Sequence, residues 1–371
     1  MYIHRIVTKD VPGLPDQDLT FWDEWRNEPL RSVLFTGPNG SGKTTLLRVI
    51  AGLWDAFGSW LRDESANLSQ MTIPESARLA RLGARAVLSE AGMAAIEIRD
   101  LLPTPLWLWV LDSRKNHTYT TLLNAVVLGA HEIGERISHP YTGSDLPEID
   151  PALNGTTMLV ELRQQLERLA LGAGVREQAP SNMLFLPTED RRIKSANRPN
   201  NNEIQPEPLY RWLTTYQATT EWNTHIESML RNLKVRDPAW FQDTLKQINT
   251  FLEASGKSII DFDANLRLTV RITKDGTTHP LSALSSGEQQ FVILIFMMNR
   301  WLMPGGVLLI DEPDLYLHVS WQRAMVRELE RLVHDKNGQL IITSHAEEIW
   351  DNFGPRSSFN LNPLIQVQTH G

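Results

Sequence analysis

Cysteine is absent from this 371-residue sequence. Without cysteine the chain cannot form disulfides, cysteine-ligated zinc or iron–sulfur sites, or a thiol nucleophile. Several classes of enzyme and metalloprotein are therefore excluded at the outset. The composition is the one expected of a protein in a reducing compartment.

Long hydrophobic runs are also missing. The longest uninterrupted apolar stretch, residues 291–298, has eight residues, whereas a transmembrane helix needs about 20. The first residues, MYIHRIVTKD, carry charges and lack the apolar core of a signal peptide. We therefore expect a cytoplasmic protein that has no membrane among its partners.

Basic residues are in the minority. The chain has 36 Lys and Arg against 44 Asp and Glu, which gives a net charge of −8. This balance argues against a protein that coats nucleic acid with a wholly basic surface, although it is compatible with a local basic groove. With 42% hydrophobic residues, the chain has room for one large domain or two smaller ones.

Strand and helix patterns alternate at both ends of the chain. The expected elements there are a strand at 31–37, helices at 43–61, 287–302 and 319–334, and strands at 307–311 and 339–343. Between them we expect a short strand at 183–187, a polar stretch at 188–207 and helices at 161–172, 209–233 and 238–255. This order predicts an α/β head, with a mixed sheet and flanking helices, that is interrupted by a mainly helical insertion.

Residues 37–44, GPNGSGKT, fit the pattern G-x-x-x-x-G-K-[ST] in full. Glycines at this spacing let the main chain wrap a phosphate chain, and the helix that follows presents its positive end to the anion. Lys43 would reach the β- and γ-phosphates, and the Thr44 hydroxyl would ligate Mg²⁺. The ATP-binding residues predicted in and beside this glycine loop are Gly37, Asn39, Gly40, Ser41, Gly42, Lys43, Thr44 and Thr45.

A second motif is the apolar strand at 307–310, which ends in Asp311 and Glu312. The last side chains of a buried parallel strand lie at the carboxyl edge of the sheet, beside the glycine loop of a neighbouring strand. We therefore predict that Asp311 holds Mg²⁺ together with Thr44. Glu312 would activate the attacking water as a general base.

A third motif, LSSGE at 284–288, lies one helix before that strand. With the glycine loop, the strand ending in Asp-Glu-Pro, the segment DLYLH at 314–318 and a histidine after the strand QLIITS, the sequence resembles an ATP-binding cassette (ABC) ATPase. All five elements occur in family order. The resemblance covers residues 1 to about 60 and 258 to 350, and it implies a P-loop ABC-ATPase head that uses ATP and Mg²⁺.

The resemblance also implies roles for further residues. In the family, the signature loop caps the γ-phosphate held by a partner subunit, so the active form would be a head-to-tail homodimer or a higher homo-oligomer. His345 would contact the γ-phosphate or the attacking water, and would be catalytic with Glu312. Asp314 would begin the loop that connects the two sites. The signature residues acting across the interface would be Ser285, Ser286, Gly287 and Glu288.

The sequence departs from the transporter type of cassette. Lys43 and Leu284 are 241 residues apart, a longer separation than in transporter subunits, and LSSGE replaces LSGGQ. DEPDLYLH resembles the DEPExxLHP pattern of the SMC, RecF and OLD branch, although Val319 replaces the usual proline. That branch includes stand-alone ATPases of antiphage systems such as Septu and PARIS. The expected division is a first part of the head at 1–135, an insertion at 136–257 and a second part at 258–371.

Some family features have no secure counterpart. Residues 188–190, after the strand at 183–187, are one candidate for the glutamine loop, yet they contain no glutamine. The aromatic residues Phe21, Trp22 and Trp25 precede the glycine loop. We interpret them as core or surface residues in preference to a platform that stacks on adenine. The polar stretch at 188–207 contains a run of basic residues that could follow a phosphate backbone or dock an acidic partner. Because acidic residues in the same stretch cancel its charge, we favour a solvated loop. The members of this basic run are Arg191, Arg192, Lys194 and Arg198.

Taken together, these patterns predict an ATP-gated dimeric switch or sensor. Because the sequence shows no DNA-cleavage motif, its output would come from a separate effector protein, such as a nuclease or a toxin. Prokaryotic antiphage defence is the leading setting, and DNA repair by a DNA-binding, RecF-like ATPase is the nearest alternative. The energising subunit of a membrane transporter and a scaffold that holds ATP without turnover are weaker alternatives.

Overall fold

The computed structural model describes residues 1–63, 87–88, 91–111, 125–130, 157–189, 191–195, 207–263 and 266–362. The predicted boundary between residues 135 and 136 lies outside these ranges, as does Arg198 of the basic run. Within the described ranges, no helix combines the length and the apolarity needed to cross a membrane.

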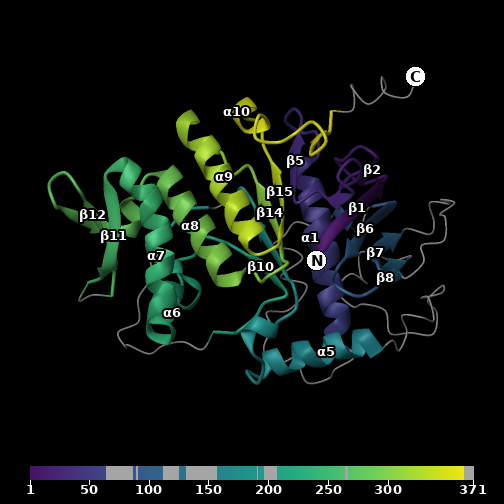
Figure 1. Cartoon of the computed structure of the whole chain (residues 1–371), viewed down its shortest axis with the longest axis horizontal. Coiled ribbons are helices and arrows are strands. Elements are labelled where there is room, and N and C mark those ends of the chain that lie inside the picture. The colour runs from purple at the N-terminus through teal and green to yellow at the C-terminus, as the bar shows by residue number, and fades with distance from the viewer. Residues whose placement is uncertain are drawn as a thin grey trace.

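A six-stranded sheet forms the centre of the molecule (Figure 1). All of its neighbouring strands pair in parallel, so their carboxyl ends share one edge. In order across the sheet, the strands are β10 (Leu213–Thr215), β9 (Met183–Leu186), β14 (Val307–Asp311), β15 (Gln339–Thr343), β5 (Ser32–Thr36) and β16 (Ser358–Asn360).

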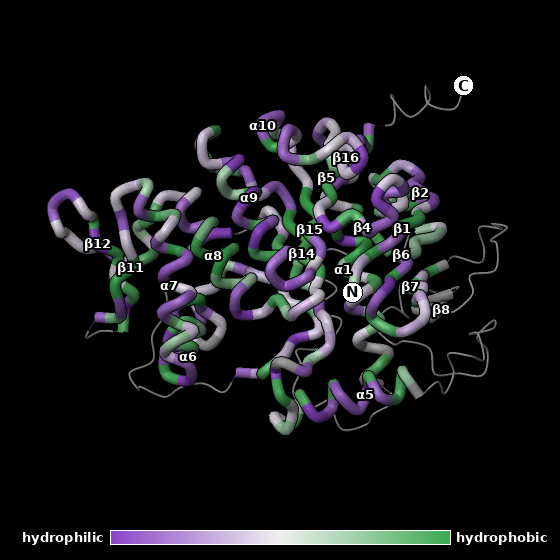
Figure 2. The backbone as a smooth tube through the Cα atoms, in the orientation of Figure 1, coloured by the Kyte–Doolittle hydropathy of each residue, from purple (hydrophilic) through white to green (hydrophobic). Residues whose placement is uncertain are grey.

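Side chains of the central sheet alternate between two hydrophobic cores. In β14, Val307 and Leu309 belong to the first core, whereas Leu308 and Ile310 belong to the second. Burial on both faces explains why β9, β14 and β15 are almost continuous runs of apolar residues. Figure 2 shows the same concentration of apolar residues in the strands at the centre.

The first core lies between the central sheet and a second, five-stranded sheet (Figure 1). Helix α1 (Lys43–Asp63) runs between the two sheets and buries Trp54 and Phe57 completely. Helix α5 (Thr157–Ala170) packs near the end of α1, where Arg163 Nε donates to the Leu61 carbonyl at 3.0 Å. The second sheet has the order β2 (Gln17–Thr20), β1 (Tyr2–Lys9), β6 (Met93–Arg99), β7 (Leu106–Leu111) and β8 (Ala125–Ala130).

The second core covers the other face of the central sheet. It includes α8 (Ser286–Trp301), whose residues 291–298 are all buried, so the longest apolar run of the sequence is core. Around it pack α6 (Ile226–Arg236), α7 (Pro238–Leu252), α9 (Val319–Asp335) and the sheet of β11 (Lys257–Phe262), β12 (Leu268–Ile272) and β13 (Thr278–Pro280). The short hairpin of β3 (Trp22–Asp23) and β4 (Glu28–Pro29) and helix α10 (Glu347–Trp350) complete the main elements described.

The segment expected to be a helical insertion is not separate from the head, because it supplies β9 and β10 to the central sheet. The helix expected from residue 209 begins only at Ile226. Trp212 explains the difference: its ring stacks on Trp54 with centroids 4.0 Å apart, and each indole Nε1 donates to the main-chain carbonyl of the other residue. This packing holds the chain extended, and Leu213 pairs with Met183 of β9.

Candidate nucleotide site

The glycine loop lies at the carboxyl edge of the central sheet, between β5 and α1. Its glycines at 37, 40 and 42 have φ values of 139°, 79° and 92°, which side chains rarely adopt. A Cβ at Gly37 would lie 2.7 Å from Ser41 Oγ, and one at Gly42 would lie 2.8 Å from the Gly13 carbonyl oxygen. The loop therefore needs glycine at these positions, and α1 begins directly after it, as the sequence predicts.

Lys43 lies across the glycine loop. Its Nζ donates to the carbonyl oxygens of Gly37 at 2.9 Å and Pro38 at 3.0 Å. Burial lowers the pKa of Lys43, whereas Glu312 and Asp311 act in the opposite direction. The two carbonyl oxygens thus hold the ammonium inside the turn. Phosphate oxygens are stronger acceptors for a charged donor than carbonyl oxygens are.

Asp311, at the end of β14, is 2% exposed and accepts hydrogen bonds from three threonines. Thr44 Oγ1 lies 2.9 Å from Asp311 Oδ2, Thr343 Oγ1 lies 2.7 Å from Oδ1, and Thr188 Oγ1 lies 2.5 Å from Oδ2. The hydroxyl of Thr44 and the carboxylate of Asp311 are the hard oxygen ligands that Mg²⁺ prefers, and both lie beside the phosphate loop. This pair of residues therefore fits the cation predicted from the sequence.

Glu312 and His345 face each other beyond Asp311. His345 Nε2 lies 3.3 Å from Glu312 Oε1, and both side chains are partly open to solvent. The Glu312 main chain has a φ of 49°, a left-handed conformation that a residue with a side chain adopts only when its surroundings enforce it. Burial and the nearby carboxylates of Asp311 and Asp314 raise the pKa of Glu312, against His345 and Lys43.

The signature loop lies at the start of α8, with Ser285 and Ser286 exposed. Ser285 caps the helix in a reciprocal capping box with Glu288. The Glu288 carboxylate is buried and also accepts from Lys257 Nζ at 2.8 Å and Ser255 Oγ at 2.7 Å. Burial alone would raise the pKa of Glu288, but these hydrogen bonds outweigh it and lower the pKa.

Gly287 of the signature touches the segment that follows Glu312. A Cβ at Gly287 would lie 2.9 Å from both the Tyr316 carbonyl oxygen and Leu317 Cδ2. In the same segment Asp314 is buried, which raises its pKa, and its Oδ1 has no hydrogen-bond partner among the described residues. Only glycine allows α8 and residues 314–317 to approach this closely within one chain.

The loop after β9 carries site residues whose role the sequence did not reveal. Besides Thr188 on Asp311, Arg191 Nη2 donates to the main-chain carbonyl of Glu312 at 2.6 Å, and the amide of Ile193 donates to Gln289 of α8 at 2.8 Å. The candidate glutamine-loop region therefore does reach Asp311, although through a threonine. The position of this loop directly after a predicted buried strand was the available signal for its role. Parallel strands bring the loops that follow them to one edge of the sheet.

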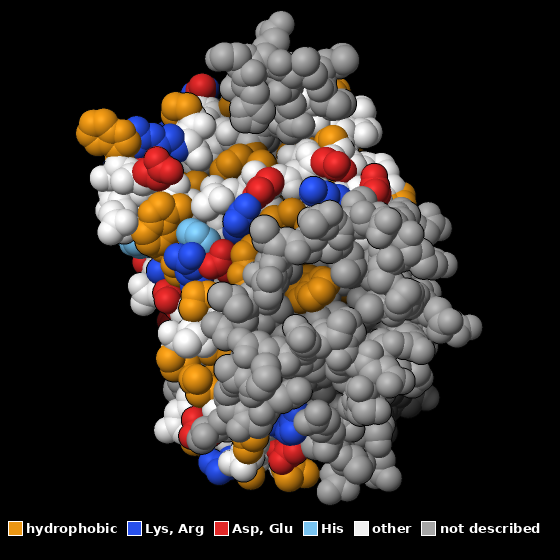
Figure 3. Space-filling view, turned by 90° about the vertical axis from the view of Figure 1, so that its right-hand side faces the viewer, with side chains coloured by type: hydrophobic (Ala, Val, Ile, Leu, Met, Phe, Trp, Pro, Cys, Tyr) orange, Lys and Arg blue, Asp and Glu red, His pale blue; other side chains and the backbone are white. Residues whose placement is uncertain are grey.

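The basic run is not uniformly a solvated loop. Arg192 and Lys194 are exposed, but Arg191 is only 4% exposed and lies among Asp311, Glu312 and Asp314. The expectation fails for Arg191 because the compensating acidic groups come from β14 and the segment after it, not from neighbours in sequence. On the face in Figure 3, the described Lys and Arg side chains are interspersed with Asp and Glu rather than gathered into one basic patch.

The aromatic residues before the glycine loop divide as core and surface. Phe21 is fully buried in the first core, and Trp22 packs edge-on against His4 at a centroid distance of 5.6 Å. Trp25 is 83% exposed, and the Arg356 guanidinium lies over its ring. These positions agree with the preference for core and surface roles.

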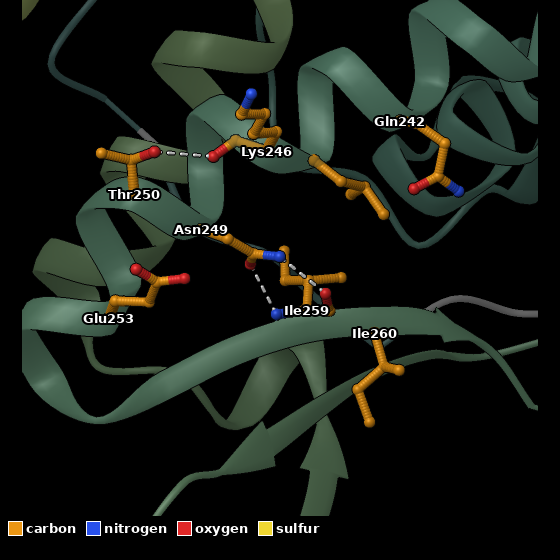
Figure 4. Close-up of a pocket in the computed structure, with 8 residues that line it drawn as sticks. Gln242, Lys246, Asn249, Thr250, Glu253, Ile259 and Ile260 are labelled. Atoms are coloured by element: carbon orange, nitrogen blue, oxygen red, sulfur yellow. Dashed lines mark hydrogen bonds between the residues drawn. The ribbon is translucent and has the colours of Figure 1, made fainter.

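A groove lies between α7 and β11 (Figure 4). It measures about 400 Å³ and is lined by polar side chains of α7, with Ile259 and Ile260 of β11 on the opposite side. The Asn249 amide spans it, donating to the Ile259 carbonyl at 2.8 Å and accepting from the Ile259 amide at 2.7 Å. Its lining residues do not overlap with those of the nucleotide site.

Comparison with known proteins gives matches of the same kind. Residues 180–350 match the family described as AAA ATPase domain. The retron Ec83 probable ATPase of Escherichia coli is 29% identical over 139 residues, covering 33% of this chain and 25% of that protein. The retron Vc95 probable ATPase of Vibrio cholerae is 30% identical over 141 residues, covering 35% and 26%. The match thus spans about a quarter of these curated relatives.

Two solved structures overlap loosely with the whole chain. The SMC head bound to the C-terminal winged-helix domain of ScpA aligns over 95% of this chain and 92% of that one, with 13% identity and a TM-score of 0.39. The SMC head domain from Thermotoga maritima has the same coverage, with 12% identity and a TM-score of 0.36. Overlaps of this size say nothing of function.

The family match at 180–350 contains Asp311, Glu312 and His345, and the central sheet brings the glycine loop from the other end of the chain to the same edge. Motif order, site geometry and the sequence relatives therefore agree in their similarity to ATPases.

Proposed function

We propose that the chain hydrolyses ATP and uses the nucleotide to switch a homodimer that controls a separate effector protein. The observation that carries the proposal is the bond from Thr44 to Asp311, because it joins the phosphate loop to the strand that ends in Glu312. A chain that only bound an anion would not need a general base and a histidine beside that pair.

The residues divide the chemistry of in-line attack on the γ-phosphate among them. Main-chain amides of the glycine loop and Lys43 would hold the phosphates, and Thr44 with Asp311 would hold Mg²⁺, which neutralises phosphate charge when bound. Glu312 would accept the proton of the attacking water. Its raised pKa suits this role, since a stronger base accepts the proton more readily.

His345 would complete the cis half of the site. It lies beside the Glu312 carboxylate, so an imidazole N–H would be available to the γ-phosphate or to the water. The exposed serines 285 and 286 at the start of α8 support the second half of the proposal, that the signature loop caps nucleotide held by the other subunit. Tyr316 and Leu317, in the segment that Asp314 begins, lie against the signature glycine, which would connect the two sites.

Prokaryotic antiphage defence is the setting that the comparisons favour, because the two curated relatives are described as probable ATPases of retrons. A nuclease or a toxin remains the kind of effector we propose. RecF-like DNA repair is the alternative setting, and the exposed Arg192 and Lys194 are the residues that DNA binding would use there.

Lys43→Ala provides the primary test of ATP binding. Removal of the ammonium should weaken MgATP binding by at least about 100-fold, because a charged hydrogen-bond donor is lost from a buried site. Equilibrium dialysis with the parental chain and Arg5→Ala, a partly exposed arginine on β1, would measure this. Equal affinity in all three proteins would refute the glycine-loop assignment. Native co-purification with mass measurement would then identify the partner and its stoichiometry.

A further inference from the structure

Arg191 is an unusual arginine because it is almost completely buried and only partly bonded. The residue is 4% exposed, and burial lowers the pKa of its guanidinium to about 10 against the opposing effect of Asp311, Asp314 and Glu312. The group therefore stays charged at neutral pH. Its Nε and Nη1 are buried without a hydrogen-bond partner among the described residues, whereas buried donors are normally bonded.

Among the described residues, Arg191 donates a hydrogen bond to the main-chain carbonyl of Glu312, at 2.6 Å from Nη2. On the other side of the same residue, the Glu312 amide donates to Thr343, to Oγ1 at 3.0 Å and to the carbonyl oxygen at 3.2 Å. The residue is therefore fixed at both its amide and its carbonyl. The two hydrogen bonds restrain the main chain before and after the Glu312 Cα, whose φ of 49° is one that a glutamate would not adopt by itself.

The left-handed conformation also decides where the Glu312 side chain points. It turns the main chain out of the β14 direction directly before Pro313, while the carboxylate remains 3.3 Å from His345 Nε2. The Glu312 carbonyl also accepts a longer bond, of 3.3 Å, from the Leu315 amide. Loss of the shorter Arg191 bond would leave the carbonyl more weakly held, so that the residue could relax towards the extended conformation favoured before proline. The carboxylate would then move relative to the phosphate loop, which is fixed separately through Thr44 and Asp311.

We propose that Arg191 is a positioning residue for ATP hydrolysis, which holds the Glu312 main chain so that its carboxylate reaches the attacking water. This inference rests on the proposed function, in which Glu312 is the general base. Arg191 makes its contact through the Glu312 carbonyl and does not need to touch the nucleotide. Its loss should therefore reduce turnover while ATP affinity is retained.

Three substitutions separate the possible contributions. Arg191→Met removes both charge and donor, Arg191→Gln keeps a donor without charge, and Arg191→Lys keeps both but loses the planar fork. Arg191→Met should lower kcat by about 10- to 100-fold, since displacement of a catalytic group by about 1 Å costs about 100-fold. KM and the Kd for MgATP should stay within about threefold of the parental values, and Arg191→Lys should recover part of the lost rate.

The double variant with Glu312→Gln gives the readout that a merely structural arginine would not produce. If Arg191 acts through the base, Arg191→Met should cause little further loss of kcat once Glu312 is replaced. A loss of full size in both backgrounds would overturn the inference. Arg331→Met, which removes an exposed arginine from α9, serves as the control for charge loss and should leave kcat within about twofold.

The outcomes also separate this inference from the proposed function. No turnover by the parental chain would overturn both, whereas parental turnover that persists in Arg191→Met would overturn the role of Arg191 alone. A parallel loss of ATP affinity and kcat would overturn it as well. If Arg191→Met fails to fold, Arg191→Lys decides: a reduced kcat at unchanged KM supports the inference, and a parental kcat overturns it.

Discussion

Glu312→Gln exchanges one carboxylate oxygen for an amide nitrogen and leaves the side chain the same size. The amide oxygen can still accept a hydrogen bond from His345, whose Nε2 now lies 3.3 Å from Glu312 Oε1. The main-chain bonds of Glu312 to Thr343 and Arg191 do not involve the side chain. The substitution therefore removes proton acceptance and one negative charge while it preserves the packing.

The structure sets different expectations for the rate and for the affinity. Loss of a general base costs about 10²- to 10⁴-fold, so kcat should fall at least about 100-fold. The lost charge lies near Asp311 and Asp314, where added phosphate charge is unfavourable. Repulsion between two charges about 5 Å apart is about 3 kcal/mol at an effective dielectric constant of 20, before screening. Because Glu312 is 23% exposed, we expect ATP to bind equally well or up to about tenfold more tightly.

Phosphate release at saturating MgATP measures the rate, equilibrium dialysis measures ATP binding, and light scattering measures mass. The variant should retain ATP and shift towards the mass of a dimer, because closure without hydrolysis cannot reverse. Glu24→Gln, at an exposed position, is the matched control. Turnover of Glu312→Gln at the parental rate would refute the general base. A loss of affinity as large as the loss of rate would refute the electrostatic reasoning.

Two further predictions concern the signature loop. Glu288→Gln should lower the free energy of unfolding by about 1–2 kcal/mol at pH 7, since the charged bond to Lys257 is lost and glutamine can still cap α8. The folded-state pKa of Glu288 lies below its usual 4.5, so its stabilisation is complete above pH 4.5 and disappears as the pH falls through the folded-state value. Urea unfolding curves of the two proteins should converge in acid, and a constant difference down to pH 3 would contradict the ion pair. Gly287→Ala should displace residues 316–317, destabilise the fold by about 1–3 kcal/mol and lower kcat. Gly354→Ala is the control, because a Cβ at Gly354 would lie 4.0 Å from Ser357 Oγ, and it should have none of these effects. Thermal denaturation and ATPase assays test both, and identical results for the two variants would argue against the close contact.

The sequence predicts elements best where pattern and length are both strong. The strand at 307–311 is found at the same residues, and α8 and α9 each begin or end within one residue of the expected positions. The glycine loop needed no tertiary information, because its phosphate-binding pattern is local. By contrast, a strand was expected at 183–187 and is found at 183–186, but its place beside β14 depends on pairing with a segment far along the chain.

Arg191 shows where local pattern fails. In sequence it belongs to a basic, polar stretch with nearby acidic residues, which is typical of solvated loops. In the structure, its carboxylate neighbours come from β14 and the segment after it, more than a hundred residues away, and its hydrogen bond within the described residues is to a main-chain carbonyl. Charge counting along the chain cannot detect such a partner. The same holds for Trp212, where a ring stacked on Trp54 overrides the helical pattern.

Asn249 has a consequence for how the protein can associate. β11 is the last strand of its small sheet, so its outer side would ordinarily recruit a strand from another molecule. The Asn249 amide already supplies a donor and an acceptor to Ile259 there, as an adjacent strand would. The side chain thus acts as a one-residue cap that terminates the sheet. Addition of another strand along β11 is therefore blocked at Ile259.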